Sequence, residues 1–188
     1  MILAAARPAR AQTPFDLVHR FPLAQSSLCC NPVIQAADGN LYGTAGGGTF
    51  GAGIAFKISP GGTVTILHDF TSSGSDGGYP TSALIQASDG NFYGTTMFGG
   101  SSNDGTIFKM TPGGAVTVLH SFDARVDGFI VIDPVIQGAD GNLYGSAEEG
   151  GPGGPSGSAG TLFRISFDGA FSLLHVFDAG DPAGGFPG

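Results

Sequence analysis

The sequence predicts an all-β protein made of β-propeller blades, each blade being a four-stranded antiparallel sheet. The main observation is a block of the form Asp-Gly-Asn-Leu/Phe-Tyr-Gly-Thr/Ser, which begins at Asp38, Asp89 and Asp140 and so recurs every 51 residues. Composition agrees, because 34 glycines and 12 prolines among 188 residues indicate many turns. Four short strands in a repeat of about 40 to 50 residues are typical of propeller blades.

The strands of the first repeat are expected at 33–36, 41–45, 54–59 and 63–70. Asp-Gly separates the first pair and Pro-Gly-Gly the last pair, and both are hairpin turn sequences because Gly adopts positive φ. In the last strand, alternation places one set of side chains on a single apolar face: Val64, Ile66, His68 and Phe70.

The whole repeat region, 14–188, is predicted to be one domain with repeats at about 31–70, 80–122 and 131–177. A further copy of the last strand stands alone at 15–21 and is expected to be an outer strand that completes a blade. Known propellers typically have four to eight blades, so three complete blades and a lone N-terminal strand predict an incomplete ring. Gly184-Gly-Phe-Pro187 matches Gly77-Gly-Tyr-Pro80, which favours a C-terminus truncated as a fourth repeat begins.

Residues 1–13 contain Ala9-x-Ala11, the small-residue spacing of a signal-peptide cleavage site. They are interpreted either as the remainder of a secretory signal or as a plain disordered N-terminus. The two cysteines, Cys29 and Cys30, are adjacent, which excludes a disulfide framework and a CxxC motif and leaves their role open.

The net charge of −8 makes nucleic acid and anionic membranes poor partners, because both would require an excess of basic residues. No apolar run is long enough to span a bilayer. The sequence therefore predicts a soluble chain without nucleic-acid partners.

Three segments, 84–96, 103–110 and 116–122, resemble the GloVer tandem repeat of bacterial "choice-of-anchor" proteins. The likeness covers about 14–188, and the strand order is more distantly similar to NHL and gluconolactonase-like propellers. The resemblance implies a secreted or cell-surface protein whose repeats precede a surface anchor. It implies no catalytic residue.

All four histidines, His19, His68, His120 and His175, occupy the same repeat position. A ring of metal ligands is one interpretation. Packing between blades is favoured, because each histidine shares its face with apolar residues, and we expect all four to be largely buried. The repeated aspartates Asp38, Asp89 and Asp140 are expected to stabilise their turns rather than to bind metal.

The connections between second and third strands vary in length, unlike the hairpin turns, and function on repeat scaffolds usually lies where loops vary. Ten of the fifteen acidic residues fall at this end: Asp69, Asp76, Asp104, Asp123, Asp127, Asp133, Glu148, Glu149, Asp178 and Asp181. This acidic rim is either a Ca²⁺ site or a solubility device. The candidate metal ligands are Asp76, Asp104, Asp127, Glu148 and Glu149.

The favoured function is a secreted, non-catalytic scaffold whose variable loops bind an extracellular glycan or protein. A gluconolactonase-like metal-dependent hydrolase and a purely structural surface repeat are the alternatives. The absence of histidine from the rim and of a nucleophile–base pair favours a non-enzyme, and enzyme activity stays open. Open blade faces also predict self-association of the arc.

Overall fold

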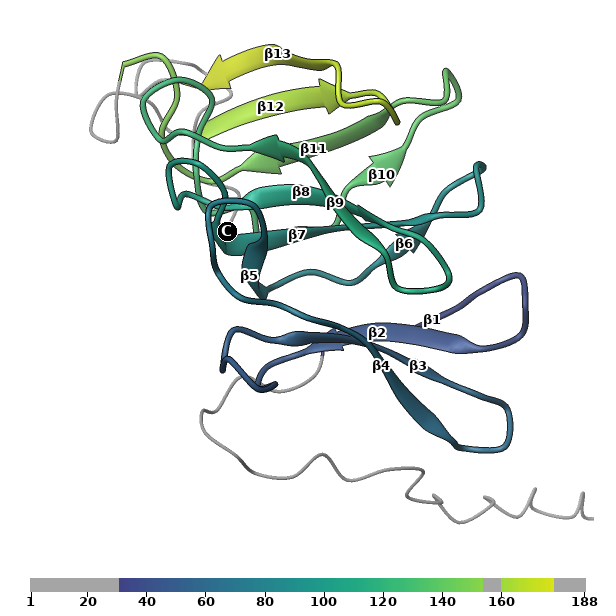
Figure 1. The fold of residues 1–188 in the computed structure, drawn as a ribbon. Coiled ribbons are helices and arrows are strands. Elements are labelled where there is room, and N and C mark those ends of the chain that lie inside the picture. Colours follow the sequence, from purple (N-terminus) through teal and green to yellow (C-terminus); the bar gives the residue numbers. More distant parts are fainter. Residues whose placement is uncertain (1–30, 154–159, 178–188) are drawn as a thin grey trace, which may run out of the picture.

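The structure, a computed structural model, describes residues 31–153 and 160–177 and contains no helix in those ranges. No segment described there could therefore cross a membrane as a helix. Three separate antiparallel sheets follow one another along the chain and stack face to face (Figure 1). Apart from β5, which pairs with β7, each strand pairs with its sequence neighbour, which is the meander expected of a propeller blade.

The first blade is formed by β1 (Ile34–Gln35), β2 (Leu41–Ala45), β3 (Ile54–Ile58) and β4 (Val64–Asp69). The second blade contains β5 (Gly77–Pro80), β6 (Ile85–Gln86), β7 (Phe92–Gly99), β8 (Thr106–Met110) and β9 (Val116–Ser121). The third blade is formed by β10 (Ile136–Gln137), β11 (Leu143–Ala147), β12 (Gly160–Ile165) and β13 (Phe171–Phe177). The prediction of three four-stranded blades is confirmed, whereas the predicted strand at 15–21 lies outside the described residues.

The second blade has one strand that was not predicted. Its innermost strand is divided into β5 and β6, both paired with β7. In the third blade the equivalent of β5 is reduced to a single bridge between Phe129 and Glu149. β5 was not predicted because its short Gly-Gly-Tyr-Pro segment lacks the alternation of apolar and polar residues that is typical of a strand.

A β-bulge interrupts the last strand of every blade and makes part of the predicted alternation wrong. In the first blade Phe56 pairs with Ile66 and Ala55 with His68, so Leu67 is the extra residue. The same shift occurs in the other two blades. Because the bulge resets the period, Ile66 is exposed instead of sharing the buried face, while Leu67 packs against the core.

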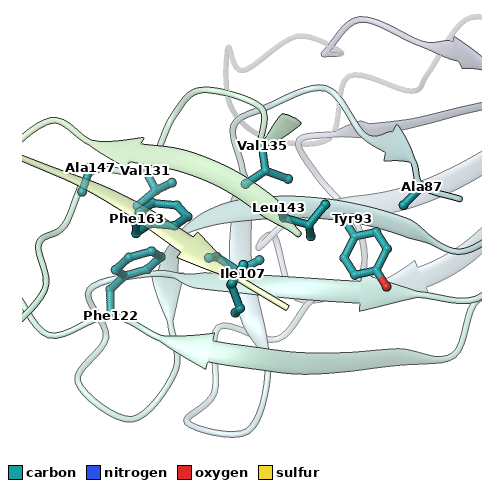
Figure 2. Close-up of a cluster of buried hydrophobic side chains, with 10 residues drawn as sticks. Ala87, Tyr93, Ile107, Phe122, Val131, Val135, Leu143, Ala147 and Phe163 are labelled. Atoms are coloured by element: carbon teal, nitrogen blue, oxygen red, sulfur yellow. The ribbon is translucent and has the colours of Figure 1, made fainter. Parts of the chain in front are cut away.

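Besides a small cluster within the first blade, formed by Ala45, Ile54 and Phe56, the hydrophobic core consists of two clusters that lie between blades. One cluster joins Tyr42 and Phe70 of the first blade to Phe92 and Phe108 of the second. The other joins the second blade to the third, as Figure 2 shows for its ten residues: Ala87, Tyr93, Ile107, Phe122, Val131, Val135, Leu143, Ala147, Phe163 and Ile165. The contacts between blades thus bury apolar faces that a single sheet would leave open.

Two contacts recur at both interfaces between blades. The ring of Tyr42 stacks on Phe92 with centroids 4.1 Å apart, and the ring of Tyr93 stacks on Phe167 at 5.2 Å. A glutamine of the following blade also accepts a hydrogen bond from a turn of the preceding one, Gln86 from Ala37 N and Gln137 from Ser88 N, both at 2.9 Å. The 51-residue repeat therefore specifies a repeating interface as well as a repeating sheet.

The repeated Asp-Gly-Asn turns have the structure that the sequence predicts. In the second blade Asp89 accepts hydrogen bonds from the backbone N and the side chain of Asn91, from the Tyr93 hydroxyl at 2.8 Å and from Lys109 at 2.9 Å. Asp38 and Asp140 accept the corresponding bonds from their own Asn and Tyr. These carboxylates fix the turn and position the tyrosine that enters the next interface.

This turn chemistry predicts a loss of stability at both extremes of pH. Burial alone would raise the pKa of Asp89, but the bonds from Lys109, Asn91 and Tyr93 outweigh it and hold that pKa below 3.8. Burial and the bond to Asp38 raise the pKa of Tyr42 from 10.0 to about 12. The stabilisation by the Asp89 carboxylate is complete above the pKa that Asp89 has in the unfolded chain, and it is lost as pH falls through the lower pKa of the folded protein. The stabilisation by Tyr42 is complete below pH 10.0, and it is lost as pH rises from 10.0 to about 12.

Urea unfolding as a function of pH measures both losses. Asp89→Asn should flatten the acid side of the profile, and Tyr42→Phe should flatten the alkaline side. An unchanged acid profile in Asp89→Asn would show that this carboxylate is not linked to folding.

Candidate functional site

The variable loops gather at one end of the three sheets and the hairpin turns at the other (Figure 1). We define the rim as the connections at 46–53, 70–76, 100–105, 122–135 and 148–153, together with Phe98 at the adjoining end of β7. The longest connection continues into 154–159, which lie outside the described residues. The rim is the surface on which the sequence places function.

Three of the five candidate metal ligands are used to hold the rim together. Asp76 accepts hydrogen bonds from Thr71 N and from its own neighbour Gly77 N, and contacts His68 Nε2 at 3.2 Å. Asp104 accepts a bond from Ala124 N at 2.9 Å, which ties two loops of the second blade. Their oxygens therefore have internal donors.

Asp127 is the most deeply buried of these acids. It contacts His120 Nε2 at 2.6 Å and accepts a bond from Asp123 N at 2.7 Å. The pair joins the outer strand β9 to the loop that leads into the third blade. This geometry is that of a structural carboxylate with paired polar neighbours.

Glu148 and Glu149 are exposed, next to the bridge between Phe129 and Glu149. The structure does not bring the five candidates together, and in 31–153 and 160–177 no group of three metal-binding side chains is present. Binding of Ca²⁺ at the rim thus stays a prediction without a defined ligand set.

We expect Asp127→Ala to lower the free energy of unfolding by about 1–3 kcal/mol, because it leaves buried donors unpaired. The loss should be equal with and without about 10 mM Ca²⁺, since the partners of Asp127 are protein groups. Thermal unfolding measures it, with Asp133→Ala at an exposed rim position as the matched control. A loss seen only in Ca²⁺ would instead make Asp127 a metal ligand.

The interpretation that the histidines pack between blades is confirmed in part. His120 stacks on Phe171 of the third blade, with centroids 3.8 Å apart and rings 3° from parallel. His68 and His120 are half-buried and His175 is exposed, so the expectation that the histidines are largely buried is wrong for His175. The reason is that this side chain faces the next blade, and no blade follows the third among the described residues. His19, Cys29 and Cys30 lie outside them.

Exposed apolar side chains also lie on the rim, and they were not predicted from the sequence. Phe50 is 64% exposed on the first long loop, and Phe98 and Val126 are also exposed. Tyr79 contacts Phe98 edge to face at 5.5 Å. Poor fit to the strand alternation was the available signal, since these residues lie at strand ends or in loops where no core position is predicted.

The rim loops that carry these side chains are braced by hydrogen bonds to backbone N–H groups. Thr49 N donates to the Asp69 carboxylate at 2.9 Å, and Gly99 N donates to Asn103 Oδ1 at 3.1 Å. A braced loop loses little conformational entropy when a ligand binds. The rim therefore combines exposed apolar groups with acidic neighbours on ordered loops.

Three stacked four-stranded meanders with a loop-built rim define a repeat protein of the β-propeller class. The chain belongs to the Gloeobacter/Verrucomicrobia repeat family, whose sequence profile matches residues 9–188, and this confirms the resemblance to the GloVer repeat.

No curated protein matches the chain. Among solved structures, one similar chain is the X-ray structure of a protein assigned by inference as a gluconolactonase. It is 19% identical with a TM-score of 0.43, over 79% of this chain and 59% of that one. This chain thus spans about 59% of the length of that structure.

Proposed function

We propose that the chain is a secreted or surface-attached repeat protein without catalytic activity, whose rim binds an extracellular glycan or protein. The observation that supports it best is the exposure of Phe50, Phe98 and Val126 on the rim, where no neighbouring blade requires them. Aromatic side chains are enriched at the centres of binding interfaces, where they provide a large contact area.

The charge of the rim narrows the class of ligand. Glu148 and Glu149 are exposed on the same rim, and the chain as a whole carries a charge of −8. An acidic surface repels polyanions, so neutral polysaccharides and basic or neutral proteins are the ligands that fit. The hydrolase alternative draws no support from residues 31–153 and 160–177, which hold no cluster of three metal-binding side chains.

The experiment is a binding screen against an array of neutral and anionic glycans and a panel of extracellular proteins. The double variant Phe50→Ser/Phe98→Ser removes the rim aromatics, and Ile66→Ser removes an equally exposed side chain from the outer strand β4 as the matched control. We expect the double variant to bind at least about tenfold more weakly than the wild type, and Ile66→Ser to bind normally.

Binding that survives the double variant would place the ligand away from the rim. No binding to any member of either panel would favour the purely structural alternative. Turnover of a lactone that requires a divalent cation would favour the hydrolase.

A further inference from the structure

Each interface inside this chain is made by two different faces of the repeat. The following blade contributes a leading face, which in the second blade includes Leu84, Phe92 and Met110 and in the third Val135, Leu143 and Ile165, all fully buried. The preceding blade contributes a trailing face, which in the second blade includes Tyr93 and Ile107, also fully buried. The two faces are complementary, and the chain forms this contact twice.

On the leading face of the first blade Phe56 is buried, as its equivalent Phe108 is, but other side chains of this face are exposed. Val33, equivalent to Leu84, is 44% exposed, and Leu41 and Ile58 are only half-buried although their equivalents are buried. A pocket of about 520 Å³ opens beside them, with Gln35, Leu41 and Pro60 among its lining residues. At the equivalent position of the second and third blades, a tyrosine of the preceding blade stacks on the sheet.

The trailing face of the third blade is also open. Leu162 is 37% exposed, whereas its equivalent Ile107 has 0% exposure inside the chain. Ile136 is 63% exposed and Leu174 46%, whereas their equivalents Ile85 and Leu119 pack against the core. Exposed apolar side chains gathered on one sheet face are typical of an interaction surface.

We propose that the trailing face of one copy of this chain docks on the leading face of a second copy, in the geometry of the internal interfaces. Tyr144 of one copy enters the pocket between Leu41 and Pro60 of the other. Those two residues are the equivalents of Phe92 and Phe167, on which Tyr42 and Tyr93 stack within the chain.

The glutamine hydrogen bond of the internal interfaces also has an equivalent at the contact between two copies. Gln86 and Gln137 accept from the backbone N–H of Ala37 and Ser88 in the preceding blade. The next pair in this series is Gln35, which lines the pocket, and the N–H of Ala139 in a second copy. Because the two faces differ, the contact is head to tail, and such contacts close into rings when the rotation allows.

Sedimentation velocity of the full chain over about 1–200 µM tests this. The average mass of the wild-type species should rise with protein concentration. High salt should increase this rise, because salt screens the repulsion between copies that each carry a charge of −8. Leu162→Asp on the trailing face and Val33→Asp on the leading face should each weaken association by at least about tenfold. Phe50→Asp, on the exposed rim, is the matched control and should associate normally.

A mixture of the two variants distinguishes head-to-tail docking from non-specific association. Leu162→Asp keeps an intact leading face and Val33→Asp an intact trailing face, so the two variants should form a 1:1 complex although each associates only weakly with itself. A wild type that is monomeric at every concentration, or covered by its own terminal segments, would overturn the proposal. So would a mixture that stays monomeric, or a Phe50→Asp variant as defective as Leu162→Asp.

Discussion

Substitution of Phe122 by Ala should lower the free energy of unfolding by about 3–5 kcal/mol. Phe122 is fully buried between the second and third blades, with its ring 5.4 Å from Phe163 and 5.9 Å from Phe171. Its removal leaves a cavity that neighbouring rings on two separate sheets cannot fill. Stability of a domain of this size is typically only about 5–15 kcal/mol, so the effect is large.

Urea unfolding followed by tyrosine fluorescence measures this loss. Phe50→Ala is the matched control, because Phe50 is 64% exposed and should change stability by less than about 0.5 kcal/mol. Equal losses in the two variants would mean that the blades do not pack through Phe122.

Substitution of Gly94 by Ala should cost about 1–3 kcal/mol, although it adds only one methyl group. Gly94 lies inside β7, and a Cβ there would be 2.7 Å from Phe108 Cζ and 2.9 Å from Leu84 Cδ2. Both distances are too short, and the ring belongs to a packed core. The glycine that recurs in the Asn-Leu/Phe-Tyr-Gly block is thus needed because the phenylalanine ring of the next strand packs directly over it.

Gly113→Ala is the control, because its Cβ would have only Thr111 Oγ1 nearby, at 3.8 Å. The double variant Gly94→Ala/Phe108→Leu should recover part of the loss caused by the first change, since the shorter side chain leaves room for the methyl group. Thermal unfolding of the four proteins measures both effects. A Gly94→Ala variant as stable as Gly113→Ala would contradict the close approach.

The repeat made most of the fold predictable. Strand limits in the first blade differ from the prediction by at most one residue at either end, because Asp-Gly and Pro-Gly-Gly turns flank the strands. The bulge at Leu67 was not predictable from alternation, because both Ile66 and Leu67 are apolar and either could face the core. Gly94 could have been identified, since a glycine inside a strand often marks a close approach.

The candidate site was predictable only as a surface. Variable loop length located the rim, but composition could not separate acids that fix loops from acids that face solvent. Asp127 and Glu149 are the same kind of residue in sequence, yet one is buried against His120 and the other is exposed. Whether a carboxylate has internal donors depends on contacts between loops, such as that of Asp104 with Ala124 N, which no local pattern records.

The repeats stack as blades through one repeating interface. Nuclear Overhauser effects between the rings of Tyr42 and Phe92, and between those of Tyr93 and Phe167, test it most directly. The ring centroids lie 4.1 Å and 5.2 Å apart, so both pairs should give clear cross-peaks. Absence of both cross-peaks in a folded sample with assigned ring signals would contradict the stacked arrangement.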